Sequence, residues 1–115
     1  MIKAEAIRAI VSQYEGFGWQ LRKVLLQPQL RASLEADLND LFDHVDVIES
    51  DLDAAWFTRE AKDGGMAWEL RALHESPFAL IEVVDADVSN SELNDILSDA
   101  EARLRERRWS RGNGN

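Results

Sequence analysis

The segment Met66–Ala72 constrains the fold more than any other part of the chain, because bulky apolar residues at even positions alternate with charged residues at odd positions. This period of two is typical of a β-strand with one buried face. Similar stretches lie at 52–57 and 78–84, and short polar loops, Lys62-Asp63-Gly64 and Glu75-Ser76, separate them from the first. The sequence therefore predicts three consecutive antiparallel strands, with the glycine of the first loop in the left-handed conformation.

The loop lengths also predict how these strands pair. A three-residue hairpin and then a two-residue turn give four pairs: Trp56 with Leu70, Thr58 with Trp68, Leu70 with Ile81, and Trp68 with Val83. This register predicts one buried face, formed by Trp56, Trp68, Leu70, Ile81 and Val83.

Three other segments have helical patterns. Apolar residues recur at every third or fourth position in residues 2–14 and again from Pro28 to Val45, where proline suits the first turn of a helix. Ser89 and Glu92 have the spacing of a capping box, which predicts that a third helix begins there. Between the first two helices, Phe17, Trp19, Leu21 and Leu25 alternate with polar residues, and they predict a first strand whose odd positions face inward.

These elements predict one α+β domain over residues 1–109, in the order α-β-α-β-β-β-α. A chain of 115 residues is too short to divide into two stable domains. The simplest packing is a four-stranded, largely antiparallel sheet with the helices on one face. We assign no regular structure to residues 46–51, and we expect residues 110–115 to form a disordered polar tail.

Composition narrows the classes of function. The formal net charge of −9 argues against binding to nucleic acid, which requires clustered Lys and Arg. No apolar run is long enough to span a membrane, so we expect no membrane association. The chain has no Cys, which agrees with a reducing, cytoplasmic location. We expect no cofactor.

Negative charge is concentrated in residues 35–53, which carry carboxylates and no Lys or Arg. Such a surface attracts and steers a basic protein, as an inhibitor or immunity protein does with a cationic toxin or nuclease. The predicted acidic interaction surface comprises Glu35, Asp37, Asp40, Asp43, Asp46, Asp51 and Asp53.

The predicted register also leaves large apolar residues on the outer face of the sheet. A contiguous patch of this kind is more than a monomer normally exposes, and a symmetric homodimer would bury it. The predicted dimer face comprises Phe57, Leu73, Phe78, Leu80 and Val84, with Glu69 and Arg71 at its charged rim. The alternative is that the C-terminal helix folds over this face.

No pattern of catalytic residues stands out. The histidines are His44 and His74, and the sequence lacks both a phosphate loop and a Gly-x-Ser-x-Gly motif. The segment Asp43–Asp46, with Asp51 and Asp53, could gather a cation, but a solvated acidic loop is the better interpretation. We therefore favour a non-enzymatic interaction module. The alternative is a small-molecule binder or small enzyme with a pocket lined by Trp19, Trp56 and Trp68.

Overall fold

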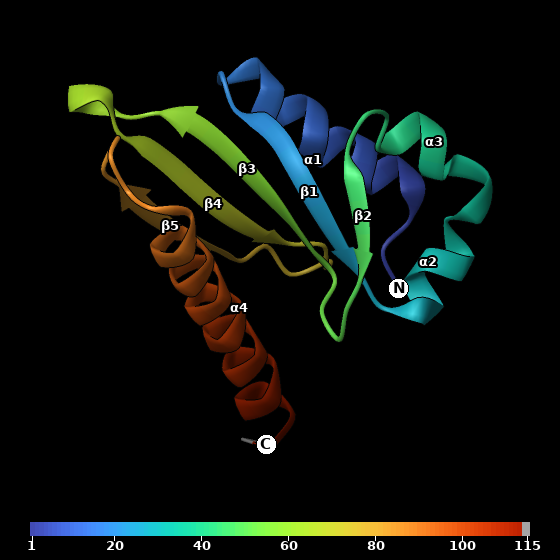
Figure 1. Cartoon of the computed structure of the whole chain (residues 1–115). Helices are drawn as coiled ribbons and strands as arrows, with labels where there is room; N and C mark the ends of the chain where they lie inside the picture. Colours follow the sequence, from blue (N-terminus) through green and yellow to red (C-terminus); the bar gives the residue numbers. More distant parts are fainter. Residues whose placement is uncertain (114–115) are drawn as a thin grey trace.

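The computed structural model describes the backbone of residues 1–113 and the side chains of residues 1–107. Five strands form one mixed sheet in the order β2-β1-β3-β4-β5 (Figure 1). The strands are β1 (Gln20–Leu26), β2 (Asp46–Glu49), β3 (Ala54–Glu60), β4 (Met66–Ala72) and β5 (Ala79–Val84). The α-helices are α1 (Ala4–Gly16), α2 (Pro28–Ser33), α3 (Leu38–Leu41) and α4 (Asn90–Asn113), and short 3₁₀ turns, η1 (Glu35–Asp37) and η2 (Lys62–Gly64), complete the fold. The domain is α+β as predicted, but the sheet has one strand more than predicted.

The helices cover both faces of the sheet, so the prediction that they share one face is wrong. In Figure 1, α1 passes behind the sheet, α2 and α3 lie beside β2, and α4 begins in front of β5. Each face has its own core. The α1-side core includes Ile7, Leu26, Leu30, Leu34, Leu41, Phe57 and Leu73. The α4-side core includes Leu25, Trp56, Leu70, Leu97, Ala100 and Leu104. The central strand β3 is therefore buried on both faces over five successive residues.

The hairpin between β3 and β4 has the predicted register. Trp56 lies opposite Leu70, and Thr58 lies opposite Trp68. Gly64 has φ +80°, as the predicted left-handed loop residue requires. The loop closes with a hydrogen bond of 2.9 Å from the Ala61 N–H to the Gly65 carbonyl. This hairpin was predictable because both its strand pattern and its loop are local in sequence.

Strand β5 is shifted by one residue from the predicted register. Leu70 lies opposite Leu80 and not Ile81. The cause is a longer loop: the Leu73 N–H donates to the Asp53 carbonyl at 2.9 Å, and pairing with β5 resumes where the Ala72 N–H donates to the Phe78 carbonyl at 2.9 Å. A shift of one residue turns every side chain of the strand to the other face.

A bulge in β1 changes which positions face inward. Trp19 and Leu21 contact the α1-side core, as the odd-position pattern predicts. The pairing with β3 then skips a residue between Leu21 and Lys23, after which the even residues Val24 and Leu26 face the same core. Phe17, which was predicted to face inward, lies in the turn before the strand with 68% of its surface exposed.

The single helix predicted from Pro28 to Val45 is broken, and a strand follows it. Leu34 leaves the helical conformation with φ −98° and ψ 2°, and the chain continues through η1 to α3, which ends at Leu41. Asp and Asn are frequent in this stretch and compete for backbone hydrogen bonds, which weakens a long helix. Residues 46–49, to which we assigned no regular structure, form β2, which pairs in parallel with β1.

Ser89 caps the last helix as predicted, although Glu92 accepts from the Ser89 hydroxyl and not, as in a full capping box, from its backbone N–H. The Glu92 N–H donates to Ser89 Oγ at 3.1 Å, and Ser89 Oγ donates to the Glu92 carboxylate at 3.0 Å. The tail predicted at 110–115 falls on residues whose side chains, and for 114–115 also the backbone, lie outside the described part of the chain. That tail stays a prediction.

Candidate functional site

Five of the seven predicted acidic residues come from consecutive elements on the β2 side of the sheet (Figure 1). Glu35 and Asp37 lie on η1, Asp40 lies on α3, Asp43 lies in the following loop, and Asp46 begins β2. All except Asp37, which is half-buried, are exposed. We call these five residues the acidic surface.

The other two predicted residues hold the fold together. The Nε–H of Arg105, on α4, donates to both carboxylate oxygens of Asp51, with both distances 2.8 Å. Asp53 accepts from the backbone N–H of Gln27 at 2.8 Å and from its side-chain amide at 2.9 Å. These carboxylates therefore anchor α4 and the end of β1, and we exclude them from the acidic surface.

The acidic surface is largely uncompensated. Asp40 forms an ion pair with Arg8 at 2.8 Å, and Asp43 lies 3.2 Å from the imidazole of His44. Within residues 1–107, no ion pair joins Glu35, Asp37 or Asp46 to a cation. Like charges held at such density repel one another and oppose folding, so these carboxylates give the fold no evident benefit.

Some of the acidic residues before and within α4 have structural roles. Asp85 and Asp87 have no ion-pair partner within residues 1–107, and they lie in the loop before a long helix. Glu92 accepts a hydrogen bond from the residue that caps this helix, and Asp99 forms an ion pair with Arg103 at 3.2 Å. Glu92 and Asp99 thus have a structural explanation, which Glu35, Asp37 and Asp46 lack.

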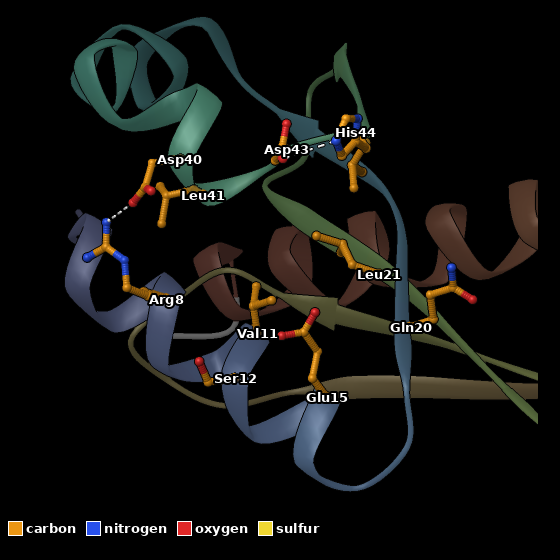
Figure 2. Close-up of a pocket in the computed structure, with 11 residues that line it drawn as sticks. Arg8, Val11, Ser12, Glu15, Gln20, Leu21, Asp40, Leu41, Asp43 and His44 are labelled. Atoms are coloured by element: carbon orange, nitrogen blue, oxygen red, sulfur yellow. Dashed lines mark hydrogen bonds and ion pairs between the residues drawn. The ribbon is translucent and has the colours of Figure 1, made fainter.

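A recess of about 500 Å³ adjoins the acidic surface, between α1, β1 and the loop from α3 to β2 (Figure 2). Its polar lining comprises Arg8, Ser12, Glu15, Gln20, Asp40, Asp43 and His44. Figure 2 shows Glu15, from α1, and Asp43, from the loop, on opposite sides of this recess. The recess is open to solvent, and His44 in its rim has φ +62°, the left-handed conformation that His adopts more readily than most residues.

The contribution of α1 to this recess was not predicted from the sequence. Arg8, Ser12 and Glu15 are spaced by four and three residues, which places them on one face of a helix. This helical spacing is visible in the sequence. The sequence does not show that the polar face of α1 lies beside α3, because the contact of Arg8 with Asp40 joins residues 32 positions apart.

The predicted dimer face does not exist as one surface. Phe57 and Leu73 are buried in the α1-side core, whereas Phe78 and Leu80 pack against the α4-side core. Val84 is also buried, and the Arg107 guanidinium lies 3.9 Å from the centre of the Phe78 ring. The error follows from the register shift and from helices on both faces.

The charged rim predicted for that face is also engaged within the chain. The Tyr14 hydroxyl of α1 donates to the Glu69 carboxylate, and the Arg71 guanidinium donates to the carbonyl of Ala72. Burial, followed by the hydrogen bond and the charge of Glu69, raises the pKa of Tyr14 well above its usual range. Homodimerisation itself stays a proposal, which needs a different surface.

The three tryptophans do not line one pocket. Trp19 belongs to the α1-side core, whereas Trp56 and Trp68 lie on the opposite face of the sheet. Trp56 is fully buried and its indole N–H donates to the Glu101 carboxylate at 2.9 Å, while its ring meets Trp68 edge-on with centroids 5.9 Å apart. Core packing accounts for these side chains.

Within the part of the chain that the structure describes, no helix is long and apolar enough to cross a membrane. Among the side chains of the same part of the chain, no three His, Asp or Glu residues gather as a metal-binding group.

Comparison of the chain with protein-family models, with curated proteins and with solved structures finds no match.

Proposed function

We propose that this protein is a non-enzymatic interaction module that binds a basic protein through the acidic surface. The observation that carries the proposal is the contrast between carboxylates: Asp51 and Asp53 hold elements together, whereas Glu35, Asp37 and Asp46 have no cationic partner among residues 1–107. Carboxylates that have no cationic partner within the described chain can pair with the cations of a ligand. A cytoplasmic location belongs to the same proposal.

The recess gives this surface a place for one basic side chain. Glu15 and Asp43 face it from opposite sides, so an inserted Lys or Arg would meet carboxylates from two elements. Arg and carboxylate form strong, directional hydrogen bonds, which would add specificity to the general attraction. The surrounding charge would act mainly on the association rate, and that rate would fall with added salt.

Two variants with the same net charge test the proposal. The first reverses three exposed carboxylates of the acidic surface, Glu35, Asp43 and Asp46, to Lys, and the second reverses three exposed carboxylates elsewhere, Glu60, Asp85 and Asp87. A deca-lysine peptide serves as the basic probe, and binding is measured by fluorescence anisotropy over a series of salt concentrations. We expect the first variant to bind at least about tenfold more weakly than the second, since several charges at one site each contribute up to ~1 kcal/mol.

Equal binding by the two variants would contradict the proposal, because net charge alone would then account for the attraction. Affinity of the wild-type protein that did not change with salt would contradict it as well. Circular dichroism of both variants confirms that the reversals leave the fold intact, as expected for exposed turn, loop and strand-end positions.

A further inference from the structure

Strand β5 is an edge of the sheet, and it presents both apolar side chains and free backbone groups. Ile81 is 54% exposed and Val83 is 66% exposed. The Phe78 carbonyl accepts from Ala72 of β4, so the alternation of an antiparallel ladder directs the even residues of β5 toward β4. The N–H and C=O groups of Ala79, Ile81 and Val83 consequently point away from the sheet.

The two edges of the sheet differ in their protection. At the other edge, β2 has four residues, and Asp46 and Glu49 are charged and exposed, which are features that keep edge strands from pairing. β5 is longer and has Glu82 as its one charged residue. In Figure 1, α4 covers one face of β5, whereas α1 lies on the opposite face of the sheet, near β1 and away from β5. Ile81 and Val83 belong to the face that α4 leaves uncovered, because they alternate with Leu80 and Val84.

The charges near β5 favour a second copy of this chain over a basic partner. Glu82 accepts a hydrogen bond from Arg103 of α4, and Arg103 also pairs with Asp99. Arg107 lies over Phe78 at the beginning of the strand. The one carboxylate within β5 is thus balanced by a cation of α4, and the exposed carboxylates Asp85 and Asp87 lie beyond the end of the strand. Two copies can therefore approach along the strand with less repulsion than at the acidic surface.

We propose that two copies pair antiparallel through β5, about a twofold axis at Ile81, to form one continuous sheet. Residues directly opposite must share a face, so Ile81 meets Ile81 of the partner subunit and Val83 meets Ala79 of the partner subunit. Glu82 then lies opposite Leu80 of the partner subunit. A twofold axis at Glu82 would instead place two Glu82 carboxylates directly opposite each other, which is unfavourable.

The interface is small. It consists of one strand edge and a few apolar side chains, less than the ~1,600 Å² of a standard interface, so we expect a dissociation constant in the micromolar range. This dimer uses the edge opposite the acidic surface, so it is independent of the proposed binding of a basic protein.

Sedimentation velocity on the full chain tests the proposal. At tens of micromolar, we expect the wild-type protein to sediment mainly as a dimer and Ile81→Lys to sediment as a monomer, because two like charges would lie opposite each other on the axis. Ile48→Lys is the matched control, since Ile48 is 41% exposed on the other edge strand. We expect it to remain a dimer. A monomeric wild-type protein, or dimerisation that Ile81→Lys does not weaken, would overturn the proposal.

A cysteine pair tests the register, because the natural chain has no Cys. In Ile81→Cys the two Cα atoms would be about 5.5 Å apart, within the range for a disulfide bond. In Val83→Cys the two cysteines would be separated along the strands by about 13 Å, too far to join. We expect oxidation to cross-link the first variant and not the second. Cross-linking of Val83→Cys without Ile81→Cys would overturn the assigned register.

Discussion

Replacing Phe57 with Ala is expected to lower the free energy of unfolding by about 3–5 kcal/mol. Phe57 is fully buried in the α1-side core, and its ring stacks on Tyr14 of α1 with centroids 4.0 Å apart and an interplanar angle of 17°. Truncation of a buried Phe to Ala costs about 3–5 kcal/mol, and the stacked pair accounts for roughly 0.5–1.5 kcal/mol beyond simple burial. Domains of this size are commonly stable by only about 5–15 kcal/mol, so the loss would be large.

Guanidinium unfolding, followed by far-UV circular dichroism, measures this difference. Phe17→Ala is the matched control, since Phe17 is 68% exposed and should contribute less than about 0.5 kcal/mol. The pair is informative because the alternation in the sequence predicts the reverse, with Phe17 inside and Phe57 on an open face. A cost below about 1 kcal/mol for Phe57→Ala would refute the reasoning, because α1 would then not close over that face of the sheet.

Two further predictions concern a close backbone contact and a buried hydroxyl. Gly65→Ala should cost about 1–3 kcal/mol, because the added Cβ would lie 2.6 Å from the Val84 carbonyl oxygen, whereas Gly16→Ala, with nothing within 4 Å, should cost no stability in the same unfolding assay. Burial raises the pKa of Tyr14 in the folded protein, so the stability that depends on its neutral hydroxyl is present below the ordinary tyrosine pKa of 10.0 and is lost as the pH rises above it. Tyr14→Phe should flatten this alkaline loss in melting temperature, and an unchanged slope would show that Tyr14 is not responsible.

Local patterns in the sequence were sufficient where both partners of an interaction lie close in the chain. The β3–β4 hairpin follows from alternation and from a loop with a left-handed glycine, and the start of α4 follows from Ser89 and Glu92. Both signals require only a few consecutive residues. Fold class and domain number follow from the same elements and from chain length.

The errors arose where contacts between distant segments decide the structure. The register of β5 depends on Leu73 bonding to Asp53, and the two-sided burial of β3 depends on a helix more than thirty residues away. Strand β2 has four residues, too few for a period of two to be recognised.

The candidate surfaces were predicted only in part, because they too depend on contacts between distant segments. The acidic stretch is visible in the sequence, but which carboxylates are free is not. Asp51 meets Arg105, which lies 54 positions along the chain, and Asp53 meets Gln27. Ile81 and Val83 were assigned to the core because the one-residue shift of β5 could not be anticipated from its loop.

Amide chemical shifts during titration with the deca-lysine peptide test the central claim most directly. We predict that the largest changes fall on residues 35–46 and on the recess around Glu15, while residues 85–99, which are also acidic, change little. High salt should reverse these changes, because exposed charges are screened. Shifts that cluster instead at residues 85–99, or that spread evenly over all exposed carboxylates, would contradict the proposal that the acidic surface is the site that binds a basic partner.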